Sequence, residues 1–255
     1  TGLGRVYGKK SIKARLIRII TKILYKTAFL CCDKVIFQNN DDINEFVSSG
    51  YLPEKKAVKV DGSGVNMERF VRKPLPEKPV FLMVGRIIKE KGVLDYCEAA
   101  RIVKKKYNDA EFVLLGGFDS SLGALKREDL SQYIDDGSII FPGEVKDPAE
   151  FYGKCSVFVL PSYYREGLPR TILEAMSCAR AVITTDSIGC RDPIIDGENG
   201  FLIQPGDYNE LANKMICLIE DRQLLENMAE KSYERCKSVY EVGVVNKKMR
   251  EYLKY

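Results

Sequence analysis

Short apolar runs alternate with segments of helical periodicity along most of this chain. Runs rich in β-branched and aromatic residues, typical of strands buried on both faces, occupy residues 80–84, 112–115, 139–141, 157–160 and 181–184. Apolar positions three or four residues apart predict helices at 93–107, 122–134, 147–154, 170–178, 208–220, 222–237 and 241–255. This alternation predicts an α/β fold with a doubly wound parallel sheet, whose ligands bind beyond the carboxyl ends of the strands.

The first part of the chain repeats this pattern on a smaller scale. It predicts in turn a glycine-containing loop, a long helix, a strand, a short helix and a strand at 1–8, 11–30, 34–38, 41–49 and 57–61. The helix at 11–30 has one face of mainly Ile and Leu residues and an opposite face of Arg and Lys residues. Two interpretations remain open, because such a helix can pack on a core with its basic side solvated or lie on an anionic membrane surface.

Three prolines between Lys73 and Pro79 form the clearest linker of the chain. We therefore predict the remainder of a first α/β domain over 1–72 and a second, larger domain over 73–238. A C-terminal helical segment over 239–255 completes the predicted organisation.

Composition narrows the possible functions mainly by exclusion. A net charge of +4 is too small to predict a nucleic-acid partner, and the absence of histidine removes the commonest metal ligand and general base. Most of the eight cysteines lie in predicted helices or beside strands, which favours reduced, buried thiols of a cytoplasmic protein. No signal peptide and no apolar run of about 18 residues occurs. We predict a cytoplasmic location, with peripheral contact to the inner membrane surface through the 11–30 helix as an option, and no metal site.

The main candidate chemistry lies around the helix predicted at 170–178. With Pro169 as its predicted first residue, this helix offers free N–H groups and a partial positive charge that suit a phosphate. Gly167 lets a ligand approach the backbone, and Glu166 and Glu174 place carboxylates on either side. Such a site suits a nucleotide sugar, which has a diphosphate and many hydroxyl groups. The alternative is a pair of solvated glutamates, the second of them bonded to the arginine one turn earlier.

A second group of candidates follows the strand at 80–84. Arg86 and Lys91 lie after Gly85, in the turn that leads to the next helix, and can converge on one diphosphate. A basic loop alone is more commonly just solvated. Its position about 75 residues before the glutamates, in the same strand–helix order, favours a shared site.

Residues 166–174 (EGLPRTILE) resemble the Glu-x7-Glu element of the family-4 retaining glycosyltransferases of GT-B fold. Residues 185–202 (TDSIGCRDPIIDGENGFL) are similar to the capsule and O-antigen branch of that family, and the resemblance covers most of the chain from residue 61 to residue 220. Ala179, Ala181 and Asp192 depart from the Gly, Pro and Glu that are usual there. These departures concern loop geometry more than chemistry.

This resemblance implies a role for each candidate. Arg86 and Lys91 would neutralise the leaving nucleotide diphosphate, Glu166 would face the sugar as a catalytic group, and Glu174 would hold the ribose. The donor site would be completed by Gly85, Gly143, Val145, Gly167, Leu168 and Arg170, with the turn at 143–145 meeting the base through backbone groups. The donor would be a UDP- or GDP-sugar, with no further cofactor. The acceptor would be a sugar or a lipid-linked glycan in surface polysaccharide synthesis.

In this family two domains of similar size face each other across a cleft. Residues 62–66 resemble the hinge, and the helix at 241–255 resembles the one that crosses back to the first domain. Since few elements precede residue 73, the resemblance implies an N-terminal truncation and a chain that binds donor but transfers no sugar by itself. The missing part would supply a glycine-rich loop and a histidine. Two other functions stay open: a non-catalytic nucleotide-binding module of the same fold, and a sugar-nucleotide epimerase of related fold, which would want further acid–base residues.

Overall fold

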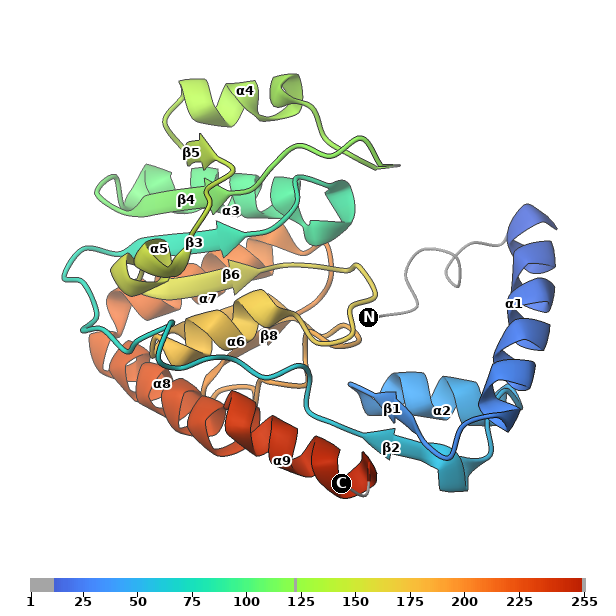
Figure 1. Ribbon diagram of the computed structural model, residues 1–255. Helices are drawn as coiled ribbons and strands as arrows, with labels where there is room; N and C mark the ends of the chain where they lie inside the picture. The colour runs from blue at the N-terminus through green and yellow to red at the C-terminus, as the bar shows by residue number, and fades with distance from the viewer. Residues whose placement is uncertain (1–11, 122, 254–255) are drawn as a thin grey trace.

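The computed structural model describes residues 12–121 and 123–253 of the chain (Figure 1). Its main unit is a six-stranded sheet in the order β5-β4-β3-β6-β7-β8, with all neighbouring strands parallel. The strands are β3 (Val80–Val84), β4 (Glu111–Leu115), β5 (Ile140–Gly143), β6 (Val157–Leu160), β7 (Ala181–Thr185) and β8 (Gly200–Ile203). Counted from β3, this is the 3-2-1-4-5-6 order of a doubly wound fold. The predicted fold class is confirmed.

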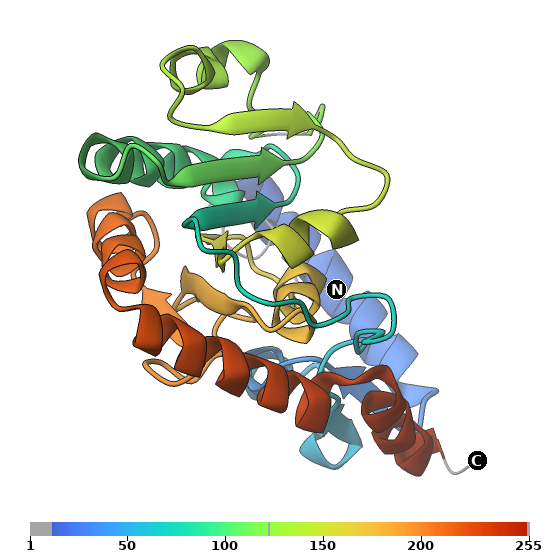
Figure 2. The same cartoon turned by 90° about the vertical axis from the view of Figure 1, so that its left-hand side faces the viewer.

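Helices cover both faces of this sheet. Figure 2 shows α3 and α7 on one side and α5 and α6 on the other. The helices of this unit are α3 (Val93–Lys106), α4 (Arg127–Asp135), α5 (Ala149–Lys154), α6 (Arg170–Ser177), α7 (Tyr208–Glu220) and α8 (Arg222–Arg235). Because both faces are covered, every residue of β6 and β7 is buried. Burial on both sides explains why β6 is an unbroken apolar run and why β7 begins with three apolar residues in succession, rather than either strand alternating apolar and polar residues.

The predicted helix over 122–134 begins too early. In the structure α4 begins at Arg127, and the preceding segment lies along the turn after β3. There Leu125 N donates to Ile87 O, and Lys89 N donates to the carbonyl of Gly123. These extended hydrogen bonds use backbone groups that a helix would need internally, so tertiary pairing overrides the local helical preference.

Three smaller corrections concern the start of α6, the end of α8 and one additional strand. Pro169 is the N-cap residue of α6, with φ −65° and ψ 117°, rather than its first helical residue. The helix predicted over 222–237 ends at Arg235 and continues as a π-helical turn over Cys236–Tyr240. Strand β8 was not expected; it begins at Gly200, where a Cβ would overlap the carbonyl of Val182 in the neighbouring strand.

The N-terminal part forms a small separate layer. It contains α1 (Ile12–Leu30), β1 (Val35–Phe37), α2 (Asn40–Ser48), a 3-10 turn (Glu54–Lys56) and β2 (Ala57–Lys59), and β1 pairs with β2 in parallel. An aromatic cluster around Phe46 joins these elements, with Tyr25 and Phe29 contributed by α1. The predicted glycine-containing loop at 1–8 lies outside the described residues.

The predicted apolar face of α1 is exposed. Ile23 and Leu30 keep 60% and 78% of their surface accessible, and Ile19 and Ile20 are about half exposed. In Figure 1 this helix stands at the edge of the molecule, away from the main sheet. The apolar stripe therefore does not pack on the core formed by the described residues. No helix in those parts of the chain is long and apolar enough to cross a membrane.

The C-terminal helix α9 (Val242–Leu253) connects the two parts. Figure 1 shows it running from the end of α8 toward β1 and β2. Lys248 Nζ donates to Asp61 Oδ2 at 2.8 Å, and Val65 N and Val242 N form backbone hydrogen bonds with Tyr240 O and Val65 O. The segment after β2 is thus tied to α9 through both backbone and charge.

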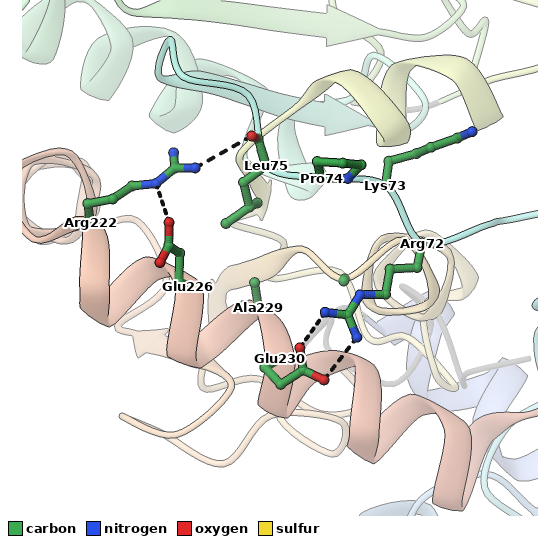
Figure 3. Close-up of a pocket in the computed structure, with 9 residues that line it drawn as sticks. Arg72, Lys73, Pro74, Leu75, Arg222, Glu226, Ala229 and Glu230 are labelled. Atoms are coloured by element: carbon green, nitrogen blue, oxygen red, sulfur yellow. Dashed lines mark hydrogen bonds and ion pairs between the residues drawn. The ribbon is translucent and has the colours of Figure 1, made fainter.

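The proline-containing linker is attached to α8 rather than free. Figure 3 shows Arg72 bonded to Glu230 through both of its terminal nitrogens, at 2.9 and 2.5 Å. Arg222 donates to the carbonyl of Pro76 at 2.8 Å and pairs with Glu226. A cavity of about 650 Å³ lies between this linker and α8. None of the predicted site residues lines this cavity.

All eight cysteines are free thiols. Burial raises the pKa of Cys97, Cys155 and Cys236 to about 12, so these three stay protonated and behave as small apolar side chains.

Candidate active site

The strand order reverses between β3 and β6, and the predicted site residues follow these two strands. Gly85 and Arg86 come directly after β3, and the loop that contains Glu166 comes after β6. A crevice at such a switch point is where doubly wound folds bind ligands. Gly116, at the end of β4, lies so close to the Gly85 carbonyl that any side chain would overlap it. The strand ends therefore approach each other only because glycine stands there.

A cavity of about 480 Å³ opens at this edge of the sheet. The ends of β3 and β4 and the turn after β5 line it, and three predicted site residues are among them: Gly85, Arg86 and Val145. Phe118 gives it an aromatic wall, supported by Phe141 at a ring-centroid distance of 5.5 Å. Mixed apolar and polar walls suit a ligand with a flat ring and charged groups.

Arg86 stands at the rim of this cavity and is half exposed. Its Nη1 donates to Asp119 Oδ2 at 2.8 Å, and its guanidinium lies 5.8 Å from the ring centroid of Tyr164. The backbone N–H of Ser121 and the Arg86 guanidinium together lower the pKa of Asp119, which keeps that carboxylate ionised. An exposed ion pair of this kind is weak, so an incoming phosphate can compete for the guanidinium.

Lys91 and Glu166 form a direct ion pair. Lys91 Nζ donates to Glu166 Oε1, and Ser162 Oγ lies 3.4 Å from the same oxygen. Their side chains are only 13% and 16% exposed. The structure thus joins the two groups of candidates that the sequence separates by 75 residues.

Gly92 allows this contact. It closes the 3-10 turn over Lys89–Lys91 with φ +73°, and a Cβ there would overlap the carbonyl oxygen of Pro161. The carbonyl of Glu90 accepts hydrogen bonds from the backbone N–H groups of Tyr163 and Tyr164, both at 2.9 Å. The turn after β3 and the loop after β6 therefore pack backbone to backbone, which brings the lysine beside the glutamate.

Glu174 lies apart from that pair. It is half-buried on α6, and Glu174 Oε2 accepts a hydrogen bond from the buried Tyr152 hydroxyl at 2.9 Å. Burial raises the pKa of Glu174, and the Tyr152 hydroxyl and the Arg170 charge oppose that shift. Among the described residues no hydrogen-bond donor occupies its other oxygen, Oε1, so that oxygen can accept from a ligand hydroxyl.

Of the remaining predicted residues, two glycines accept hydrogen bonds through their backbone carbonyls, one leucine is buried and one arginine is exposed. Gly167 O accepts a hydrogen bond from Asn39 Nδ2 at 3.0 Å, so its carbonyl faces the N-terminal part. Leu168 is buried and packs against the backbone of Gly62. Gly143 O accepts a hydrogen bond from the N–H of Gly116 at 3.0 Å, and Arg170 is exposed at the start of α6.

Sequence reasoning missed several polar residues of this region. Asp119 and Glu144 line the cavity and follow β4 and β5, so the rule that ligands bind at carboxyl ends could have found them. Tyr152 and Tyr164 carry no comparable signal, because their contacts with Glu174 and Arg86 come from separate elements. Within the described residues no group of three potential metal ligands occurs.

Comparison of the sequence with known proteins identifies a family and several relatives of this chain. The family described as "Glycosyl transferases group 1" matches residues 66–235. The chain is 32% identical over 243 residues to the N,N'-diacetylbacillosaminyl-diphospho-undecaprenol alpha-1,3-N-acetylgalactosaminyltransferase of Campylobacter jejuni, covering 90% of the chain and 62% of that protein. It is 23% identical to the capsular polysaccharide biosynthesis glycosyltransferase CapM of Staphylococcus aureus, covering 94% and 67% respectively. The chain thus spans about two thirds of the length of these curated relatives.

Solved structures agree on the fold. The crystal structure of Anabaena Alr3699/HepE in complex with UDP-glucose superposes with a TM-score of 0.75 at 20% identity. The match covers 93% of this chain and 69% of that one. At this identity the likeness concerns the fold alone.

Proposed function

This chain belongs to the group 1 glycosyl transferases, and from that premise we propose that it serves the retaining transfer of a sugar from a nucleotide-diphosphate sugar. The proposed acceptor is a sugar or a lipid-linked glycan in surface polysaccharide synthesis. Support comes from the names of the two curated relatives, which specify transfer to an undecaprenol-linked sugar and capsule synthesis. The proposed donor is a UDP- or GDP-sugar, in line with the UDP-glucose complex of the structural relative.

The observation that carries this proposal is the Lys91–Glu166 contact at the switch point of the sheet, between the turn after β3, which also contains Arg86, and the loop after β6. Two cations at one edge can stabilise the negative charge that develops on a departing diphosphate. The carboxylate next to them would face the sugar, where it positions the donor or supports positive charge at the anomeric carbon. Little water reaches the pair, which strengthens these interactions.

The rest of the donor would extend along the cavity. In this proposal Gly85, Gly143 and Val145 present backbone groups to the base. Glu174 accepts hydrogen bonds from the ribose hydroxyls through its free oxygen. The segment formed by Gly167, Leu168 and Arg170 contacts the diphosphate and the sugar at the start of α6.

The proposed domain organisation follows the sequence prediction: an acceptor-side part over 1–72, a donor-binding domain over 73–238 and a crossing helix over 239–255. The acceptor would bind mainly to the first part. In the described residues this part has a sheet of only two strands, β1 and β2, which is small for an acceptor-binding domain. We accordingly expect the chain by itself to bind donor without robust transfer. The exposed apolar face and basic residues of α1 would support peripheral contact with the cytoplasmic face of the membrane.

A screen of nucleotides and nucleotide sugars by thermal shift tests the function. A ligand at about 100 times its dissociation constant adds roughly 2.7 kcal/mol to the free energy of unfolding. We expect nucleoside diphosphates and their sugars to raise the melting temperature, and nucleosides to leave it nearly unchanged. A product assay then separates the alternatives, because a transferase yields a new glycoside, a binding module yields nothing and an epimerase yields an altered donor. No shift with any nucleotide would contradict the proposal.

The two glutamates should differ when each is changed to glutamine. Glu174→Gln should mainly lower donor affinity, because a ribose contact is made equally in the ground and transition states. Glu166→Gln should mainly lower turnover in the form of the protein that transfers sugar. Steady-state kinetics with varied donor concentration measure both effects. The same kinetic signature for both variants would remove the reason for assigning them different roles.

A further inference from the structure

A buried polar cluster joins α2 to the loop that carries Glu166. Asn39 is fully buried, and its Nδ2 donates to the carbonyl of Gly167 at 3.0 Å and to Asp42 Oδ2 at 3.2 Å. Asn39 Oδ1 accepts from the backbone N–H of Asp42 at 2.7 Å, which caps the N-terminus of α2. One side chain therefore begins a helix and also holds a loop 128 residues later in the chain.

Arg165 supplies the charge of this cluster. Its Nη2 and Nε donate to Asp42 Oδ1 at 2.7 and 3.1 Å, and its Nη1 donates to Glu45 Oε2 at 2.9 Å. Asp42 is only 6% exposed, and a carboxylate at that depth is costly unless it is paired and hydrogen-bonded. The Asn39 cluster, formed by Asn39, Asp42, Glu45, Arg165 and the Gly167 carbonyl, meets that requirement.

The cluster contacts both neighbours of Glu166. Arg165 precedes it in the chain, and Gly167 follows it. On another side of the loop, a Cβ placed at Gly189 would come within 2.5 and 2.7 Å of the Gly167 and Glu166 carbonyl oxygens, so that backbone also packs closely. With the loop backbone held on two sides, the Glu166 side chain lies against Lys91.

We infer that Asn39 and Arg165 are positioning residues for the donor sugar. Asn39 acts from the N-terminal part, and Arg165 lies in the loop that carries Glu166 and anchors it to Asp42 and Glu45 of α2. Neither side chain needs to touch the ligand, since each holds the backbone next to the carboxylate that faces the sugar. The inference rests on the proposed function. It implies that the N-terminal part shapes the sugar subsite as well as any acceptor site.

Two variants separate this role from a general loss of stability. Asn39→Ser keeps an oxygen that can cap α2 but is too short to donate to the Gly167 carbonyl. Arg165→Met combined with Asp42→Asn removes the buried Arg165–Asp42 pair as a whole, and the remaining Glu45 carboxylate is 34% exposed and so reaches solvent. The matched control is Arg191→Met, which removes an ion pair to Asp41 of α2 and a second one to Asp186, with all three side chains at least 36% exposed.

The measurement is isothermal titration of the full chain with UDP, UDP-glucose, GDP and GDP-mannose. Arg86 and Lys91 hold the diphosphate in either ligand, so the variants should bind the nucleoside diphosphate within about twofold of the parent. Affinity for the nucleotide sugar should fall about tenfold, the equivalent of one lost hydrogen bond. The control should match the parent for both ligands.

Each other outcome is decisive. An unchanged ratio of sugar-nucleotide to nucleoside-diphosphate affinity in both variants would overturn the inference and leave the proposed function intact. Equal losses for both ligand types, with a lower melting temperature, would show a purely structural cluster and also overturn it. A parent chain that binds none of the four ligands would overturn the proposed function and this inference with it.

Discussion

Alanine in place of Lys91 or Arg86 should weaken nucleoside diphosphate binding by about 1.5–3 kcal/mol each, or roughly 10- to 150-fold. Each substitution removes a charge-assisted hydrogen bond to a phosphate. The loss should be larger for Lys91, because its side chain is 13% exposed whereas that of Arg86 is 52% exposed and solvent screens its charge. Isothermal titration with UDP and GDP measures both affinities.

Two comparisons make this result specific. Nucleoside binding should hardly change, since a nucleoside has no phosphate for either cation. Lys89→Ala is the matched control, because Lys89 is an exposed lysine in the same turn. Variants of Lys91 and Arg86 that bind diphosphates as the parent does would show that the two cations do not form a diphosphate site.

Gly92→Ala should lower the free energy of unfolding by about 2–5 kcal/mol, from left-handed backbone strain and overpacking together. The residue has φ +73°, which disfavours any side chain, and its Cβ would overlap the Pro161 carbonyl. That carbonyl cannot move without displacing the loop that holds Glu166. Nucleotide binding should therefore fall together with stability, as urea unfolding and titration of the folded variant would show.

Gly137→Ala separates the two causes. Gly137 has nearly the same backbone angle, φ +72°, but a Cβ added there would meet no atom of the described residues within 4 Å. It should cost only the backbone strain of about 1–2 kcal/mol and leave nucleotide binding unchanged. Equal losses in the free energy of unfolding for the two substitutions would show that overlap with the Pro161 carbonyl adds nothing to the cost of a side chain at Gly92.

Local patterning determined the elements and the fold class of this protein. The runs that became β3 and β6 are apolar throughout, and β7 is apolar up to its two final threonines, because helices cover both faces of the sheet. Burial of this kind can be predicted from the residue types alone. The glycines at strand ends and the Glu166–Glu174 spacing likewise predicted, from the order of residues alone, that the ligand site lies at the carboxyl edge of the sheet. Errors arose where a distant partner took the backbone hydrogen bonds, as at the start of α4.

Only the tertiary structure decided which of these residues meet. The Lys91–Glu166 pair spans 75 positions and the Arg165–Asp42 pair spans 123, so each depends on the order of the strands and on the place where the N-terminal part lies. The pairing of Glu174 with Tyr152 and the exposure of the apolar face of α1 depend on the same placement. Periodicity reports whether a residue is buried, because burial repeats along an element. It cannot name the partner, because a contact between elements leaves no repeating signal in either of them.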